Sequence, residues 1–187
     1  MDLHDILKLT GGLLALALFV PMIVGVVRDG GAGQSFATWI LWAVLDTILS
    51  TSIILQHGNY FIVLGFAIGG WLMAGLLLWR RRVTWGRFES GVLVLVIACL
   101  AAWRFSGALG ATMASTLVIC VAGIPGLVAL WRNPNRKLAR IWAWYVVANG
   151  LAFCGGTEWS VAERFAPGAF AVFAVLMLLA ARRKARS

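Results

Sequence analysis

Seven apolar stretches, each long enough to cross a bilayer as a helix, occupy most of this 187-residue chain. They cover residues 9–27, 36–55, 60–79, 88–105, 112–131, 138–156 and 166–181. At about 1.5 Å of rise per residue, most of these runs match the ~30 Å thickness of a hydrocarbon core. Lipid cannot satisfy open backbone groups, so each run is predicted to be a helix. We expect an all-α membrane protein with seven transmembrane helices.

The residues outside these runs are too scattered for a soluble domain, which usually needs at least about 50 contiguous residues. Only 12% of the chain is charged, against roughly 25% in soluble proteins. The net charge of +9 comes from basic residues near the ends of the apolar runs, so the expected partner is the lipid bilayer and not nucleic acid. The three cysteines lie inside apolar runs and match no metal-binding spacing. We predict no metal and no cofactor.

Lys and Arg are divided unevenly between the two sides that seven crossings would define. One side receives thirteen of them, and the other receives Lys8, Arg104 and Arg164. Cytoplasmic loops are enriched in basic residues, which predicts a cell-membrane protein with the C-terminus in the cytoplasm and the N-terminus outside. Asp2 and Asp5 precede the first run, so we interpret it as a membrane helix and not as a cleaved signal peptide.

An internal repeat relates the two halves of the chain. Its matched pairs are Pro21 with Pro125 and Arg28 with Arg132, at a spacing of 104, and Trp39 with Trp142 and Trp42 with Tyr145, at a spacing of 103. Each copy holds three spans, and the span at 88–105 stands between them. That extra crossing makes the two copies run in the same direction, as in one known plan for transporters. We predict a 3+1+3 arrangement with a first three-helix bundle at 1–82, a linker helix at 83–108 and a second bundle at 109–187.

The repeated pattern, Phe-x-Pro at Pro21, a short basic loop and then Ser-x-x-x-Trp-x-x-Trp ending at Trp42, resembles the PQ-loop repeat of SWEET and SemiSWEET transporters. The chain is identified as a divergent member, because Met22 and Gly126 replace the glutamine of that motif. Gly65 and Pro167 lie near the positions where sugar-transporting members carry an asparagine. The resemblance implies a 3+1+3 fold and alternating-access transport of a small polar solute.

Asp46 is the one ionisable residue that falls deep inside a predicted span. It lies ten residues past Phe36, or about 15 Å along a helix, which is near the bilayer midplane. A charge at that depth costs about 2.5–3.5 kcal/mol on insertion scales, so Asp46 should face the bundle interior or a wet cavity. The repeat aligns it with Asn149. We predict that both line a substrate site, where Asp46 exchanges a proton and Asn149 binds substrate. The alternative is that Asp46 is a packing residue that hydrogen-bonds across helices.

Other residues extend this predicted site. Trp42 and Ser50 can share a helix face with Asp46, and Tyr145 occupies the matching wall of the second copy. Pro21 and Pro125 each remove a backbone hydrogen bond at equivalent positions, which makes them candidate hinges.

We therefore expect a membrane transporter of a small polar solute, sugar-like or another metabolite, for which proton coupling is an option. An enzyme is not expected, because no nucleophile–base pair or metal triad can be assembled. The alternative function is a non-transporting receptor or assembly subunit with the same fold. Two bundles in one chain could form a complete pathway, so a homo-oligomer is optional.

Overall fold

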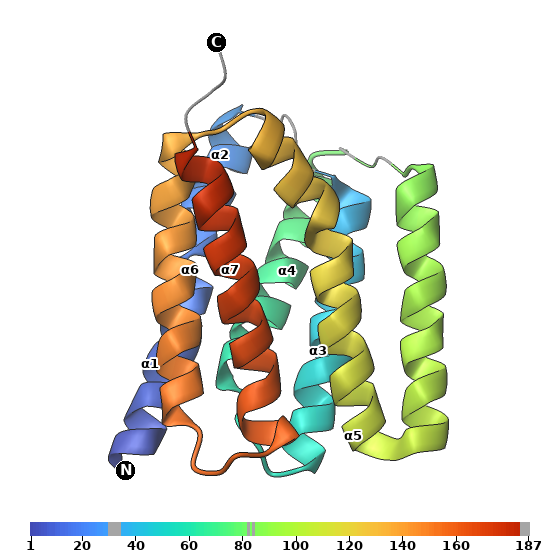
Figure 1. Ribbon diagram of the computed structural model, residues 1–187. Coiled ribbons are helices and arrows are strands. Elements are labelled where there is room, and N and C mark those ends of the chain that lie inside the picture. The colour runs from blue at the N-terminus through green and yellow to red at the C-terminus, as the bar shows by residue number, and fades with distance from the viewer. Residues whose placement is uncertain (30–34, 82, 84, 184–187) are drawn as a thin grey trace.

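The apolar runs form helices that cross the molecule from one end to the other (Figure 1). The computed structural model describes residues 1–29, 35–81, 83 and 85–183, and the described part contains no strand. Its elements are α1 (Leu3–Ala17), α2 (Phe19–Asp29), α3 (Phe36–Leu55), α4 (Phe61–Trp79), α5 (Arg87–Arg132), α6 (Arg136–Gly155), the π-helical turn η1 (Val161–Phe165) and α7 (Ala166–Arg182). The prediction of an all-helical protein is confirmed. The predicted domain boundary at residue 82 lies outside the described residues.

Five helical segments among the described residues are long and apolar enough to cross a membrane. They are Leu3–Arg28, which combines α1 and most of α2, then Phe36–Leu55, Phe61–Trp79, Arg87–Arg132 and Val161–Arg182. These segments support a membrane-embedded protein. Helix α6 is not among them, because arginines and other polar residues dilute its first turns.

Helix α5 contains a reversal of direction within its 46 residues, so it forms two antiparallel arms (Figure 1). Residues of both arms belong to one buried cluster with α3. The reversal occurs at Gly107, whose φ of 67° and ψ of −164° fall in a region that only glycine adopts easily. The first arm covers residues 87–106 and the second covers residues 108–132. These arms contain the runs that the sequence predicted as separate fourth and fifth spans.

The first apolar run is interrupted between α1 and α2 at Leu18. Pro21 explains the break, because proline has no N–H to donate to the carbonyl of Ala17 and its ring crowds that carbonyl. Pro125, its partner in the repeat, lies inside α5 without ending the helix. Of the two candidate hinges, one therefore coincides with a helix break, while the hinge role of both stays a prediction.

The helices pack in the same order in the two halves of the chain. In the first half α1 packs against α4, and α4 packs against α3. In the second half α5 packs against α7, and α7 packs against α6. The halves meet where α1 packs against α6 and α3 packs against α5. In each half, therefore, the third helix (α4 or α7) packs between the first helix (α1 or α5) and the second helix (α3 or α6).

Adjacent glycines in α1 allow close packing on both of its sides. A Cβ at Gly11 would lie 2.8 Å from the carbonyl oxygen of Ala148 in α6, and a Cβ at Gly12 would lie 2.7 Å from that of Phe61 at the start of α4. Both neighbours are backbone atoms that cannot move aside easily. Helix α1 therefore joins the halves through small residues, as is common between membrane helices.

The basic residues gather at the end of the molecule where α4 ends and α6 begins. Arg28, Arg80, Arg132 and Arg182 lie at or next to the last residues of α2, α4, α5 and α7, whereas Lys8 lies in the first half of α1, Arg104 just before the reversal of α5, and Arg164 in η1. Arg82, Lys184 and Arg186, which contributed to the predicted charge asymmetry, lie outside the described residues. We call the two ends the basic end and the N-terminal end.

Candidate functional site

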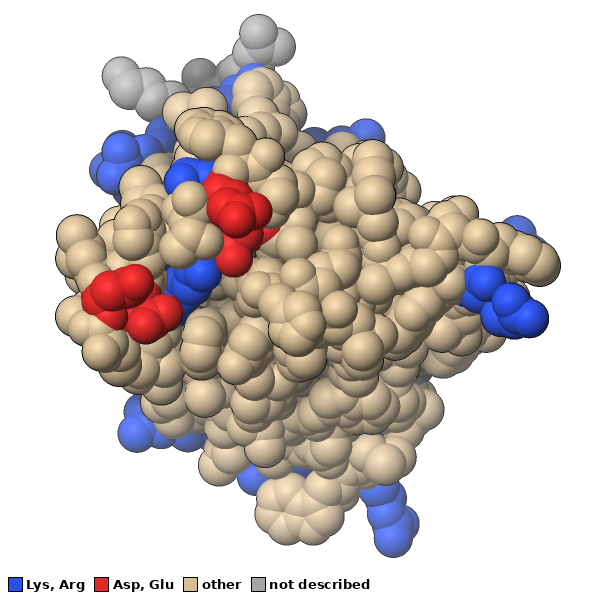
Figure 2. Space-filling model, turned by 90° about the horizontal axis from the view of Figure 1, so that it is seen from below, with Lys and Arg blue, Asp and Glu red and all other residues tan. Residues whose placement is uncertain are grey.

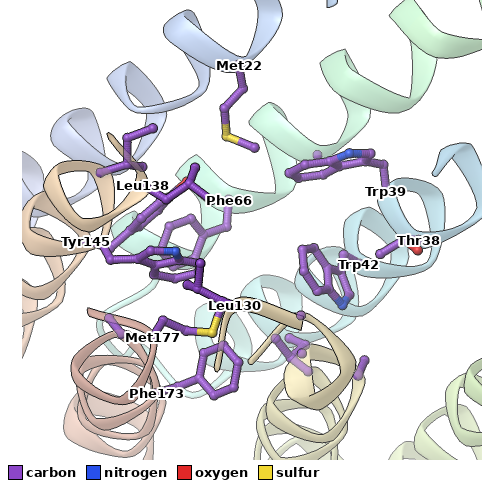
Figure 3. Close-up of a pocket in the computed structure, with 18 of the residues that line it drawn as sticks. Met22, Thr38, Trp39, Trp42, Phe66, Leu130, Leu138, Tyr145, Phe173 and Met177 are labelled. Carbon is purple, nitrogen blue, oxygen red and sulfur yellow. The ribbon is translucent and has the colours of Figure 1, made fainter. Parts of the chain in front are cut away.

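A cavity of about 960 Å³ lies between the two halves of the chain. It reaches from the middle of α3 and α6 to the basic end, where Ser35, Asn133 and Asn135 are part of its lining. Figure 3 shows Trp39 and Trp42 on one side of this cavity, with Tyr145 and Met177 across from them. The cavity therefore extends to the basic end of the molecule.

The cavity wall follows the internal repeat. Each lining residue of α3, and its N-cap residue Ser35, has a counterpart 103 positions away on α6 that also lines the cavity. The pairs are Ser35 with Leu138, Thr38 with Ile141, Trp39 with Trp142, Trp42 with Tyr145 and Asp46 with Asn149. The α2 residues Pro21, Met22, Gly25 and Val26 pair in the same way with Pro125, Gly126, Ala129 and Leu130 of α5, at a spacing of 104. Two equivalent walls thus face one chamber.

Asp46 and Asn149 lie at the deep end of the chamber. Asp46 is 6% exposed and Asn149 is 1% exposed. The Asn149 amide donates to the carbonyl of Tyr145 at 2.8 Å. Within the described part of the chain, Asp46 Oδ1 and Asn149 Oδ1 have no hydrogen-bond partner. Buried acceptors without a donor are costly, so these oxygens are suited to receive hydrogen bonds from a ligand or from water.

Aromatic rings from both halves of the chain are part of the chamber wall. The rings of Trp39 and Trp42 meet edge to face with centroids 5.5 Å apart, and the matching rings of Trp142 and Tyr145 are 5.2 Å apart. Trp42 Nε1 is buried and has no acceptor among the described residues. The chamber therefore offers aromatic faces, and Trp42 adds a buried N–H donor without an acceptor among the described residues.

The charges on the chamber wall are acidic. Of the described lining residues, Asp46 and Glu89 carry a carboxyl group and none is a lysine or arginine. Glu89 lies near the mouth, where its carboxylate accepts hydrogen bonds from the Gly86 amide and the Ser35 hydroxyl, at 3.0 and 3.3 Å. Asp46 supplies the carboxyl group at the deep end.

The N-terminal end of the molecule is closed by polar contacts between the halves. Lys8 Nζ lies 3.0 Å from Glu163 Oε2, and the Asn59 amide donates to the carbonyl of Ala152 at 2.7 Å. Figure 2 views this end, where side chains form a continuous surface and acidic residues gather on one side. The chamber is therefore open at the basic end and sealed at the other.

The structure brings together most of the predicted site residues. Asp46, Asn149, Trp42 and Tyr145 line the chamber, and so do Pro21 and Pro125. Ser50, which we expected on the same face, is not part of the lining, and its buried hydroxyl donates to the carbonyl of Thr47 at 3.2 Å.

Sequence reasoning missed some residues of the chamber. Phe66 and Phe170 line it, whereas Gly65 and Pro167, which we aligned with the family asparagine, do not. Phe66 and Phe170 are 104 positions apart, as are Pro21 and Pro125, so the repeat could have been used to predict them. Glu89 was also missed, and it has no counterpart in the second copy because it belongs to the first arm of α5. No cluster of His, Cys, Asp and Glu within the described ranges could hold a metal ion.

Comparison with known proteins found no matching protein-family model, no matching curated protein and no matching solved structure.

Proposed function

We propose that this protein is an alternating-access carrier of a small solute, with seven spans in a 3+1+3 arrangement like that of SWEET transporters. In this proposal both arms of α5 and helix α6 cross the membrane, and the first arm links the two three-helix bundles. The common packing order of the two halves supports this proposal, as does a chamber lined from both halves by residues related through the repeat. Known transporters with parallel repeats place the substrate at the interface between the repeats.

The observation that carries the proposal is a chamber open at one end and sealed at the other. A carrier needs such a state, in which a central site communicates with one side of the membrane only. If the basic end is cytoplasmic, as the charge asymmetry predicts, this is the inward-facing state. The cell membrane, with the N-terminus outside, is the proposed location. The outward-facing state would require the contacts between Lys8 and Glu163 and between Asn59 and Ala152 to open.

Flux through proteoliposomes tests this function. Purified protein is reconstituted and challenged with a panel of neutral, cationic and anionic metabolites, with and without a pH gradient. We expect protein-dependent uptake of at least one solute, and its loss in Asp46→Ala and Asn149→Ala. The matched control is Ser50→Ala, which removes a buried polar group of α3 outside the chamber and should retain flux. If no solute of any class moves, the carrier proposal is wrong and a receptor or assembly subunit becomes the better reading.

A further inference from the structure

The deep end of the chamber contains buried hydrogen-bonding atoms that have no partner among the described residues. Among the fully buried polar atoms of its described lining, Asp46 Oδ1 and Asn149 Oδ1 are acceptors without a donor, and Trp42 Nε1 is a donor without an acceptor. A ligand that satisfies this set must bring more hydrogen-bond donors than acceptors. Protonated amines, amidines and guanidines have that property, because their charged nitrogens are donors only.

The charge of the chamber favours the same class of ligand. Its described lining contains two carboxyl groups and no basic side chain. Arg28 and Arg132 stand close in sequence to the mouth residues, but both are exposed and neither is part of the lining. An anion would therefore meet carboxyl groups and no basic side chain of the described lining that could pair with it.

The aromatic wall supplies a third, independent preference. Trp39, Trp42, Trp142 and Tyr145 present rings around the chamber. The face of an aromatic ring attracts cations, and tryptophan is the strongest of the aromatic side chains in this respect. Figure 3 shows the rings of Trp42 and Tyr145 on opposite sides of the space that a ligand would fill.

We propose that the chamber binds compact organic cations that carry N–H donors, with Asp46 as the counter-charge, Asn149 as a second acceptor and the tryptophan rings as walls. This inference rests on the proposed carrier function, because the bound cations are substrates only if the protein transports them. Its binding chemistry can be tested on its own. The repeat offers a direct test, because Asp46 and Asn149 occupy equivalent positions and have side chains of the same shape, but only Asp46 can carry a negative charge.

The test uses two sets of shape-matched probes on the purified full chain in detergent. One set is benzamidinium, benzamide and benzoate, and the other is 2-phenylethylammonium, 2-phenylethanol and 3-phenylpropanoate. Isothermal titration calorimetry measures their affinities. In at least one set we expect the cation to bind about tenfold or more tightly than the neutral member, since a hydrogen-bonded charged contact is usually worth at least that factor. We expect no binding of the anions.

Four variants connect the preference to Asp46. Asp46→Asn keeps the side-chain shape and should make the cation and the neutral probe bind equally. The double variant Asp46→Asn with Asn149→Asp moves the carboxylate to the equivalent position and should recover most of the cation preference. Asn149→Asp alone should strengthen cation binding, and Ser50→Ala should leave it unchanged. Thermal unfolding of each variant verifies that it is folded.

The inference is overturned if a neutral or anionic probe binds as tightly as its cation, if neither set binds, or if the preference survives in Asp46→Asn. Flux measurements separate this failure from that of the carrier proposal. Uptake of neutral or anionic solutes without any cation would refute the inference and leave the carrier standing. Cation binding that depends on Asp46, in a protein that moves no solute, would refute the carrier and leave the binding site standing.

Discussion

Lys8 at the start of the chain and Glu163 near its end form a buried ion pair, with Nζ 3.0 Å from Oε2. Lys8 is 9% exposed and Glu163 is 6% exposed. A second Glu163 contact, from the Thr157 amide to Oε2 at 3.3 Å, holds the carboxylate in place. The pair ties α1 of the first half to η1 of the second half on the sealed side of the chamber.

Breaking this pair from one side should destabilise the sealed state strongly. Lys8→Met or Glu163→Gln leaves one partner without its opposite charge, and loss of one member of a buried pair typically costs about 3–5 kcal/mol. We expect a lower unfolding temperature for each single variant, measured by thermal unfolding in detergent. The double variant Lys8→Met with Glu163→Met should be more stable than either single variant. Equal stability of wild type and the single variants would contradict this account.

Protons and organic cations should compete for Asp46. Protonation removes the charge that binds the cation, so cation affinity is present at higher pH and is lost as the pH falls through the titration of Asp46. We expect the apparent affinity for benzamidinium to decrease on acidification in a calorimetric pH series. Glu89 at the chamber mouth is the other described carboxyl group of the lining, so Glu89→Gln is the control and should keep the pH dependence. A pH dependence that persists in Asp46→Asn would assign the proton to another group.

The ring of Trp42 should contribute to cation affinity through its face. Trp42→Ala removes both the ring and its edge-to-face contact with Trp39, and we expect benzamidinium to bind roughly three- to thirtyfold more weakly, as for a loss of about 0.6–2 kcal/mol. Trp42→Phe should lose less. Trp71→Ala is the matched control, because Trp71 is half exposed and its Nε1 donates to Thr47 Oγ1 outside the chamber. Equal effects of Trp42→Ala and Trp71→Ala would mean that the loss is not local.

The reversal of α5 should depend on the lack of a side chain at Gly107. Its backbone angles cost a residue with a Cβ on the order of 1–3 kcal/mol, so we expect Gly107→Ala to lower the unfolding temperature. Gly91→Ala is the control within the same helix, where an added Cβ meets open space and should be neutral or slightly stabilising. Thermal unfolding in detergent, followed by circular dichroism, compares the two. A Gly107→Ala protein as stable as Gly91→Ala would show that the turn tolerates other backbone angles.

The helices were predictable because apolar length is nearly all that a membrane segment requires. The chamber wall was predictable at Asp46 and Asn149 because the repeat placed two polar residues at one depth. Ser50 fails as a chamber residue although it lies one turn beyond Asp46, since the space has already closed at that depth. The pairing of Lys8 with Glu163 joins positions 155 residues apart, and no local pattern in the sequence relates them.

The two copies of the repeat carry different residues, Asp46 and Asn149, at equivalent positions of the chamber. Two identical half-proteins assembled as a symmetric dimer would each bring the same residue, and would therefore place either two acidic groups or none at the centre of the chamber. Fusion of the copies into one polypeptide lifts that constraint, so that a single acidic group can sit opposite a neutral amide. A ligand that binds between Asp46 and Asn149 would do so in one orientation, because the two halves would contact different ends of the ligand.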